Sequence, residues 1–431
     1  MMKRFTHYFI HCGLLLSLLL TTALGAEDSA KDARLPLEEL QLFAQVFEQI
    51  RSAYVEEIDD KTLIENAITG LLGELDPHSA FLKKDSYRDL QEHTSGEFGG
   101  IGIEVGMEDG FIKVISPIDD TPASRAGIEA GDLIIKLNNS AVQGMNLEEA
   151  LEMMRGAKGS PLTLTIAREN RNKPLVITVL RDIIKITSVR HKTLDEDFGY
   201  IRIAQFQANT GEEFRRSIKA LLKASSPLKG LVLDLRNNPG GLLPASVEVA
   251  DAMLDGGLVV YTEGRAESAN TRFSAKAGEL LNDTPLVILI NGGSASASEI
   301  VAGAIQDHHR GVIMGTSSFG KGSVQNILPL SDGRAIKLTT ARYFTPSGRS
   351  IQAEGVQPDI WVERAKIQLA SNRQPDIKEA DLSGHLNQGG ATSTDSDSTA
   401  KRQESLDDYQ LIEALNLLKG LAILSKQPPV N

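Results

Sequence analysis

The feature that most constrains this chain is an apolar run that ends in a turn of small residues. Residues 284–291 read Thr-Pro-Leu-Val-Ile-Leu-Ile-Asn, a pattern typical of a strand buried on both faces. Gly, Ser and Ala fill positions 292–297, and apolar residues then recur at helical spacing as far as Ile305. Ser296 is therefore predicted to lie where a buried strand turns into a helix. Unpaired N–H groups and the positive end of the helix dipole meet there and suit a developing oxyanion, so Ser296 is the candidate nucleophile.

A serine nucleophile needs a base, and Lys321 is the best candidate. The chain contains neither Gly-Asp-Ser-Gly nor Gly-x-Ser-x-Gly, the patterns that accompany a histidine base. An exposed lysine, with a pKa near ~10.4, is almost fully protonated at neutral pH, but burial lowers this pKa by up to about 3–5 units. Glycines flank Lys321 and leave room for its amine to approach Ser296. Gln325, four residues further on, is expected on the same side and can accept a hydrogen bond from the amine.

Two neighbouring serines are rival nucleophiles. Ser294 falls earlier in the turn and Ser298 falls inside the first helical turn, so both are less well aimed than Ser296. A cluster of Ser, Ala and Gly is also compatible with a flexible turn, and Gly-Lys-Gly with a solvated loop. The weight of the catalytic interpretation therefore comes from the motifs in combination.

Three ordered motifs carry a family resemblance. Residues 294–300 (Ser-Ala-Ser-Ala-Ser-Glu-Ile), 319–325 (Phe-Gly-Lys-Gly-Ser-Val-Gln) and 233–242 (Leu-Asp-Leu-Arg-Asn-Asn-Pro-Gly-Gly-Leu) together closely resemble the tail-specific, or carboxy-terminal processing, serine proteases. The resemblance extends over roughly residues 36 to 365. It implies that the nucleophile is Ser296, the general base is Lys321 and the residue that orients this lysine is Gln325.

The region 183–365 alternates strands and helices, which implies mostly parallel pairing with crossover helices. One buried strand, 231–235, is followed by Asn-Asn-Pro-Gly-Gly at 237–241. This turn places bare backbone at the carboxyl end of the strand, the edge where open α/β sheets bind ligands. The resemblance implies an oxyanion hole made by one glycine N–H and the N–H of Ala297. Of the pair Gly240 and Gly241, we select Gly241.

Residues 1–26 are predicted to be a cleavable export signal. Lys3 and Arg4 precede a short apolar core and a run of small residues, and this core is too short for a comfortable membrane span. An uncleaved anchor is the alternative. The only cysteine, Cys12, lies inside this segment, so the mature chain would have no thiol for disulfides or zinc-thiolate sites. The segment predicts a periplasmic protein. Association with the membrane is a further alternative.

Residues 36–90 are predicted to form a helical region that is interrupted at 75–82 and whose apolar stripe must be buried on something. The region 95–182 reads as many short strands with one helix at 147–154. Within it, Gly-Gly-Ile-Gly-Ile at 99–103 resembles the loop of PDZ domains whose N–H groups hold the terminal carboxylate of a peptide. Peptide binding is therefore assigned to Gly100, Ile101, Gly102 and Ile103. The side-chain pocket is expected to be lined by Ile103, Val105, Leu147, Leu151 and Met154.

The composition changes at 366–407, where Ser, Thr, Asp, Gln and Gly predict a flexible linker. Residues 408–426 then show an apolar helical stripe. A single helix has no core of its own, so it must dock on the same chain or on another subunit. We predict self-association into a homo-oligomer through this helix and the 36–90 helices.

The resemblance implies an α/β protease core with a parallel sheet like that of crotonases and Clp proteases. An inserted PDZ-like β-rich domain and helical N- and C-terminal segments complete the expected fold. The expected function is that of a periplasmic serine endopeptidase with a Ser-Lys dyad. Its expected substrates are unfolded or carboxy-terminal segments of envelope proteins, among them cell-wall hydrolases, with delivery by a lipoprotein adaptor.

No metal or other cofactor is expected, and a net charge of −12 argues against nucleic acid as a partner. Two other classes of function stay open. A PDZ scaffold with an inactive protease core would bind peptides without cleaving them. An acyl-transfer or hydratase enzyme would use the Asn-Pro-Gly-Gly loop on a thioester and would need a carboxylate in place of Lys321.

Overall fold

The computed structural model describes residues 35–365 and 408–424, apart from positions 119, 170, 172, 196 and 226. The predicted export signal and the predicted linker at 366–407 lie outside the described residues. The chain divides into two compact units, Met1–Pro77 and His78–Asn431. Across the described ranges, no helix combines the length and the apolar character that a membrane span requires.

The first unit contains the helices α2 (Leu37–Ala53) and α3 (Asp60–Gly73). The side chain of Asp59 caps α3 by accepting a hydrogen bond from the Thr62 N–H at 3.0 Å. The apolar stripe of α2 was predicted to be buried, but no residue of α2 is buried. Among the described residues, Phe47 of the stripe is partly buried and the rest of the stripe is exposed. The exposed members of the stripe are Leu37, Leu40, Phe43, Val46, Ile50 and Tyr54.

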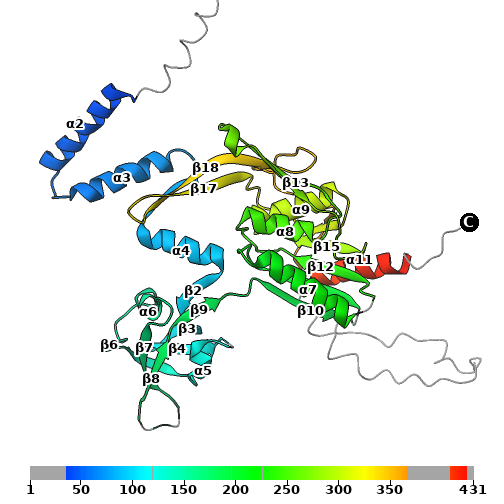
Figure 1. Ribbon diagram of the computed structural model, residues 1–431, viewed down its shortest axis with the longest axis horizontal. Helices are drawn as coiled ribbons and strands as arrows, with labels where there is room; N and C mark the ends of the chain where they lie inside the picture. The colour runs from blue at the N-terminus through cyan, green and yellow to red at the C-terminus, as the bar shows by residue number, and fades with distance from the viewer. Residues whose placement is uncertain are drawn as a thin grey trace, which may run out of the picture. The chain divides into compact units, whose positions relative to one another are not determined.

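The region predicted to be PDZ-like is a small antiparallel domain with its own apolar core. Figure 1 shows β2 and β9, which pair where the chain enters and leaves this domain. The helix predicted at 147–154 is confirmed, and a capping box of Asn146 and Glu149 begins it. The elements are β2 (Glu97–Gly100), β3 (Ile103–Glu108), β4 (Phe111–Pro117), α5 (Pro122–Arg125), β5 (Leu133–Leu137), β6 (Ser140–Ala141), α6 (Leu147–Met154), β7 (Pro161–Ala167), β8 (Leu175–Leu180) and β9 (Asp182–Lys185).

The main sheet of the second unit is parallel from β11 to β19, with β10 added antiparallel at one edge. Every residue of β12 and β15 is buried, which confirms the two apolar runs as strands covered on both faces. In spatial order the strands are β10 (Val189–Leu194), β11 (Phe198–Ile203), β12 (Gly230–Asp234), β15 (Leu286–Ile290), β16 (Val312–Gly315) and β19 (Ile360–Trp361).

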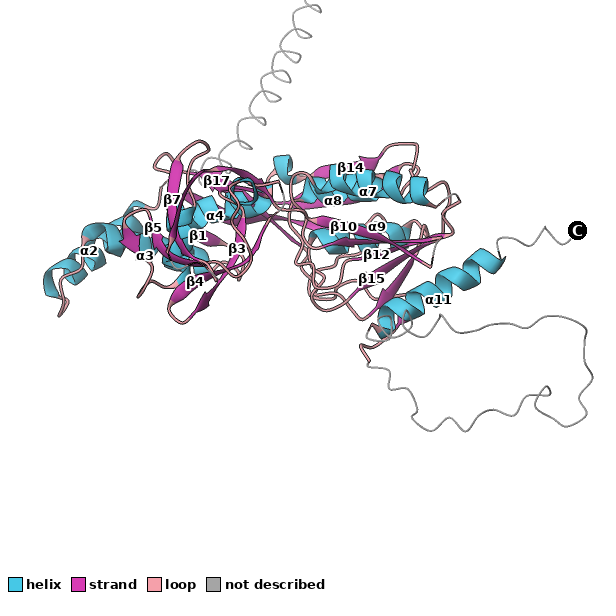
Figure 2. Ribbon diagram, turned by 90° about the horizontal axis from the view of Figure 1, so that it is seen from below, coloured by secondary structure: helices cyan, strands magenta, loops and turns pink. Residues whose placement is uncertain are grey.

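Helices cover both faces of this sheet (Figure 2). The largest apolar core lies between one face and the helices α7 (Thr210–Ala224), α8 (Leu243–Asp251) and α9 (Ala297–Asp307). The other face carries α11 (Tyr409–Leu424). The three strands that lead into the predicted catalytic turns, β12, β15 and β16, therefore have fixed backbones.

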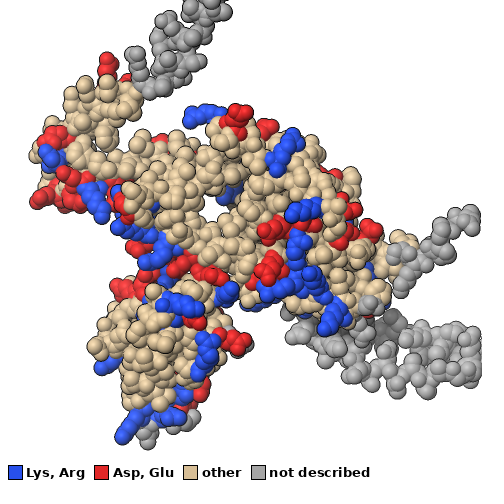
Figure 3. Space-filling model, in the orientation of Figure 1, with Lys and Arg blue, Asp and Glu red and all other residues tan. Residues whose placement is uncertain are grey.

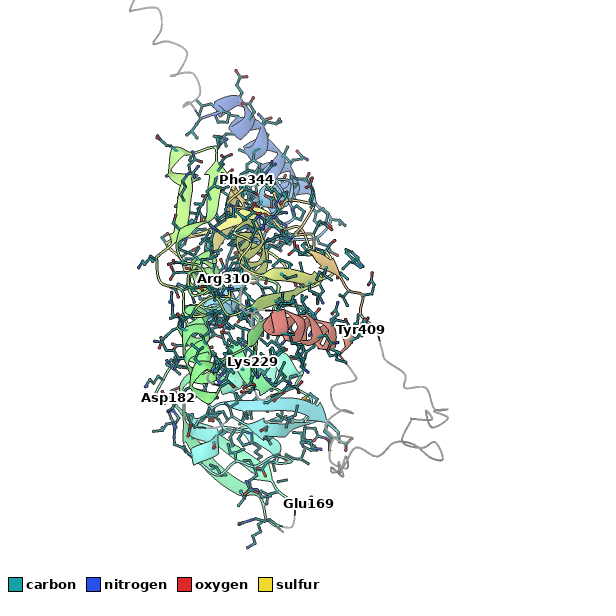
Figure 4. All side chains as sticks on the ribbon, turned by 90° about the vertical axis from the view of Figure 1, so that its right-hand side faces the viewer. Glu169, Asp182, Lys229, Arg310, Phe344 and Tyr409 are labelled. Carbon is teal, nitrogen blue, oxygen red and sulfur yellow. The ribbon has the colours of Figure 1, made fainter. Side chains whose placement is uncertain are left out.

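The stripe of α11 is buried within its own chain. Ala414, Leu418 and Ala422 pack on the sheet, and Figure 4 shows Tyr409 at the start of the helix. Arg236, which follows β12, pairs with Asp408 at 2.7 Å and anchors this end. Of the two alternatives for this helix, the structure shows docking on the same chain. Self-association stays a prediction, and it now depends on the stripe of α2.

The second unit also contains an antiparallel sheet. Only one of its strands, at 335–343, was predicted from the sequence. Its central strand β18 pairs with β1, β13 and β17, and β13 also pairs with β14. The helix α4 (Lys84–Ser95) follows β1, which lies inside the interruption predicted at 75–82. The strands are β1 (Ala80–Leu82), β13 (Gly257–Gly264), β14 (Thr271–Ala275), β17 (Ser323–Pro329) and β18 (Ala335–Phe344), and a short 3-10 helix, η1 (Glu267–Ala269), precedes β14.

Candidate active site

Ser296 occupies a strained turn between β15 and α9. Its backbone has φ +54° and ψ −112°, a combination that costs a non-glycine residue about 1–3 kcal/mol. The N–H of Ser296 donates to Glu299 Oε2 at 2.7 Å, and its carbonyl accepts from the Ile300 N–H at 3.0 Å. These bonds hold the strained conformation at the first turn of the helix. Ser296 lines a cavity at this turn.

The rival serines are buried and already bonded. Ser294 and Ser298 are both fully buried. The hydroxyl of Ser294 donates to the Leu235 carbonyl at 2.8 Å, and that of Ser298 donates to the Asn238 carbonyl at 3.0 Å. Both hydroxyls tie the α9 turn to the turn after β12, so both have structural roles.

The cavity next to Ser296 has a volume of about 750 Å³. Its walls come from α4, the turn after β12, the start of α8, α9, β17 and β18. Figure 3 shows the hollow between these elements, with atoms of basic side chains at its edge. The structure brings four of the predicted site residues into this one cavity: Gly241, Ser296, Lys321 and Gln325.

Lys321 has the properties that a neutral general base requires. Its side chain is partly buried, and burial is the main reason why its pKa lies below the ordinary value. The charge of Lys337 lowers this pKa further, while the negative charge of Glu299 opposes the shift. Among the residues that the structure describes, none forms an ion pair or a hydrogen bond with the Lys321 amine. A larger fraction of the amine is therefore neutral than in an exposed lysine.

Gln325 lines the cavity but bonds elsewhere. Its amide nitrogen donates to Ser323 Oγ at 2.8 Å and to Thr339 Oγ1 at 3.2 Å. The expectation from periodicity assumed one regular element, whereas Lys321 lies before β17 and the β17–β18 register shifts between Val324 and Gln325. The orienting role of Gln325 toward Lys321 stays a prediction.

Glu299 is a functional candidate that the sequence analysis missed. It is fully buried, and its Oε2 accepts hydrogen bonds from the backbone N–H of Ser296 at 2.7 Å and of Lys321 at 2.9 Å. Its Oε1 accepts from Ser318 Oγ at 2.6 Å and from the Gly320 N–H at 2.7 Å. One carboxylate therefore fixes the backbones of the candidate nucleophile and base relative to each other. The sequence held a signal, because Ser-x-x-Glu at a helix start is a capping-box pattern.

Tyr343 is a second residue that the sequence analysis missed. It is buried against the cavity, its hydroxyl donates to the Lys321 carbonyl oxygen, and the Ser296 side chain lies within hydrogen-bonding reach. Burial raises the pKa of Tyr343 well above its usual range, so the hydroxyl stays protonated and can donate. Only the pairing of β17 with β18 brings this residue near Lys321.

The turn after β12 presents one unpaired glycine N–H. The N–H of Gly240 donates to Asn238 Oδ1 at 2.9 Å, whereas no described residue accepts from the N–H of Gly241 or of Ala297. A Cβ on Gly240, whose φ is +102°, would lie 2.8 Å from the Cβ of Ser296. Glycine is therefore required for this close approach, and the two unpaired N–H groups suit an oxyanion.

A second pocket, of about 160 Å³, lies at the PDZ-like domain. Gly100, Ile101, Gly102 and Ile103 all line it, and no described residue accepts from the N–H groups of Ile101 and Gly102. The predicted lining of the side-chain pocket is partly wrong. Leu151 and Met154 line the pocket, but Val105 packs on the domain core and Leu147 is absent from the described lining.

Helix α4 connects the two pockets, since His93 lines both. Its charged side chains bond to α6 of the PDZ-like domain. Arg155 pairs with Asp89 at 2.8 Å, and Arg88 pairs with Glu152 at 2.9 Å. In the described part of the chain, no group of three or more His, Cys, Asp or Glu side chains is arranged to hold a metal ion.

Comparisons with known proteins indicate the family to which this chain is similar. The sequence matches the profiles of Peptidase family S41 over residues 197–362, the PDZ domain over 89–167 and the activating protease CtpB N-terminal domain over 20–86. A carboxy-terminal-processing protease of Bartonella bacilliformis is 47% identical over 395 residues, which cover 91% of each chain. The carboxy-terminal processing protease CtpA of Bacillus subtilis is 35% identical over 324 residues, 74% of this chain and 68% of that one. A solved photosystem II D1 C-terminal processing protease is 31% identical, with 75% of this chain and 92% of that chain covered and a TM-score of 0.45.

Proposed function

Because this chain belongs to peptidase family S41, the carboxy-terminal processing serine proteases, we propose that it cleaves polypeptides with a dyad of Ser296 and Lys321. One observation carries the proposal. A strained serine and a lysine with a lowered pKa line one cavity, and their backbone N–H groups bond to the same carboxylate oxygen of Glu299. The two backbone nitrogens therefore cannot be farther apart than the two hydrogen-bond lengths combined.

In the proposed mechanism, the neutral amine of Lys321 takes the proton of Ser296 as Oγ attacks the scissile carbonyl carbon. The oxyanion of the tetrahedral intermediate accepts hydrogen bonds from the N–H groups of Gly241 and Ala297. As the C–N bond breaks, the ammonium of Lys321 gives the proton to the leaving amine. Lys321 then takes a proton from water, which attacks the acyl-enzyme, and the second collapse returns this proton to Ser296.

We further propose that the pocket of the PDZ domain holds the carboxy-terminal end of the substrate. The unpaired N–H groups of Ile101 and Gly102 are suited to a terminal carboxylate, and the apolar lining is suited to the last side chain. Since α4 lines both pockets, we expect peptide binding to control the catalytic cavity through this helix. If a chain without residues 95–182 kept the rates and the substrate dependence of the full chain, this control would be excluded.

The exposed stripe of α2 supports the proposal of a homo-oligomer, because an exposed apolar patch of this kind commonly marks an interface. Phe43→Glu should then reduce the molar mass measured by light scattering. Gln45→Glu, on the opposite face of the helix, serves as the control. An unchanged mass for Phe43→Glu would exclude this interface.

The location and the substrates are proposed from the sequence. The basic and apolar segment in residues 1–26 supports export to the periplasm, and envelope proteins are the substrates that this location offers, with delivery by a lipoprotein adaptor. Finding the protein in the cytoplasmic fraction after osmotic release of the periplasm would contradict this location.

The decisive experiment incubates the full chain with an unfolded polypeptide, reduced β-casein, and follows cleavage by gel electrophoresis. Ser296→Ala and Lys321→Ala should abolish cleavage, while Lys276→Ala, an exposed lysine outside the cavity, should not. Cleavage that survives Ser296→Ala would refute the dyad. The hydratase alternative is disfavoured, since no described residue of the cavity lining is Asp or Glu.

A further inference from the structure

The lining of the catalytic cavity carries two cations and, among its described residues, no carboxylate. The cations are Lys321 and Lys337. The whole chain has 57 acidic and 45 basic residues. The lining of the cavity therefore differs from the overall composition, in which acidic residues outnumber basic ones. Lys321 must be neutral to act as a base. Lys337 is therefore the positive charge that a substrate meets in this cavity.

Lys337 lies on a backbone that cannot easily move. It belongs to the central strand β18, where it pairs with Ile327 of β17 on one side and with Ala80 of β1 on the other. Its side chain is partly buried at the cavity. In the described residues no carboxylate pairs with its ammonium, and no hydrogen bond to this ammonium is formed. A partly buried and unpaired ammonium is unfavourable, and an anionic ligand would relieve that cost.

Lys337 and Ser296 line the same cavity, so one bound peptide can contact both side chains. Lys337 is two residues from Thr339, to which Gln325 bonds, so these two β18 side chains share one face of the sheet. Lys337, Lys321 and Ser296 all line this one cavity, whose volume is about 750 Å³. A compact cavity of this volume is roughly 11 Å across, and an extended peptide, which advances ~3.3 Å per residue, crosses it in about three residues.

We propose that Lys337 binds a carboxylate of the substrate about three residues beyond the scissile bond, and that its preferred ligand is the C-terminal carboxylate of the chain being cut. This site is separate from the pocket of the PDZ domain and would favour cleavage close to a chain end. An ammonium–carboxylate bond in a partly desolvated cavity is shorter and stronger than a neutral hydrogen bond. The proposal rests on the proposed protease function.

The test uses one internally quenched peptide, copied from a site that the full chain cleaves in reduced β-casein and ending three residues beyond the scissile bond. It is made as the free acid, as the amide, and as the amide with Asp in the last position. The expected ratio of kcat/KM for the free acid over the amide is about 10 to 100, the range for a hydrogen bond to a charged group. Recovery of activity with the Asp amide would show that a side-chain carboxylate serves as well as a chain end.

Three variants test whether the acid-to-amide ratio of kcat/KM depends on Lys337. Lys337→Met should bring the acid-to-amide ratio close to one, and Lys337→Arg should keep most of it. Arg342→Met removes another cation of β18, one that is exposed and absent from the described cavity lining, and should leave the ratio unchanged. Effects of a variant on the chemistry itself cancel in the ratio, because both peptides share one scissile bond.

The outcomes separate this site from the proposed function. A ratio in Lys337→Met equal to that of the natural chain would overturn the site at Lys337 and would assign any carboxylate preference to the PDZ domain. A ratio near one in the natural chain would overturn it as well. If the natural chain cleaves neither casein nor any of the peptides, the protease function itself fails, and the carboxylate site fails with it.

Discussion

The replacement Glu299→Gln tests the central feature of the candidate active site. Each carboxylate oxygen of Glu299 accepts two hydrogen bonds, so replacing either oxygen by an amide NH₂ group loses two of the four and places donor against donor. A hydrogen bond to a charged group contributes about 1.5–3 kcal/mol. The variant should therefore lose about 3–6 kcal/mol of folding free energy, a large part of the ~5–15 kcal/mol typical of a domain.

The same replacement should change the chemistry in two ways. In either orientation of the new amide, a bond to the Gly320 or the Lys321 N–H is lost, so the base is less well fixed and kcat/KM should fall about 10²-fold. The negative charge of Glu299 raises the pKa of Lys321, and its removal should lower that pKa further. Since the proposed mechanism uses only the neutral amine of Lys321, the acid limb of the pH profile should move to lower pH.

The assay is kcat/KM against pH on the amide peptide, at a temperature where calorimetry shows the variant to be folded. The matched control is Glu213→Gln. Glu213 also accepts several hydrogen bonds, from Ser188, Val189 and Asn209, but lies outside the described lining of the cavity. The control should lower the melting temperature without moving the acid limb. The reasoning is refuted if Glu299→Gln keeps the natural acid limb and loses activity only in proportion to its unfolded fraction.

Three further variants have expected outcomes. Lys337→Met removes a charge that lowers the pKa of Lys321, so the acid limb of kcat/KM should move to higher pH, and an unchanged limb would contradict the charge interaction. Asp408→Asn should cost about 1 kcal/mol in chemical denaturation at pH 7, because the ion pair with Arg236 is partly exposed. Burial is the largest single influence and raises the pKa of Asp408, but the hydrogen bond and the charge of Arg236, together with the hydrogen bond from the Leu411 N–H and the charge of Arg364, hold this pKa below its ordinary value. The cost should therefore disappear as the pH falls through that lowered value, and a cost independent of pH would argue against the pair. Gly240→Ala places a methyl group against Ser296, the proposed nucleophile, and should reduce kcat/KM on the amide peptide at least about 10²-fold, whereas full activity would show that the turn can move.

Local patterns were sufficient to predict the elements that carry the candidate nucleophile. The apolar runs at 231–235 and 284–291 are buried strands, and the helix after the second run begins at Ala297, as its spacing predicted. Such features depend on side chains that are close in the sequence. Their periodicity therefore reports burial directly.

The relations between distant segments were decided by the tertiary structure. Glu299 bonds to residues 318–321, Tyr343 reaches Lys321 across the β17–β18 pair, and Lys337 enters the same cavity from β18. Each contact depends on strand register and on the packing of separate elements, which no short-range period encodes. The sequence by itself thus determined the candidate nucleophile and its base, while only the fold decided which carboxylate fixes them and which cation shares their cavity.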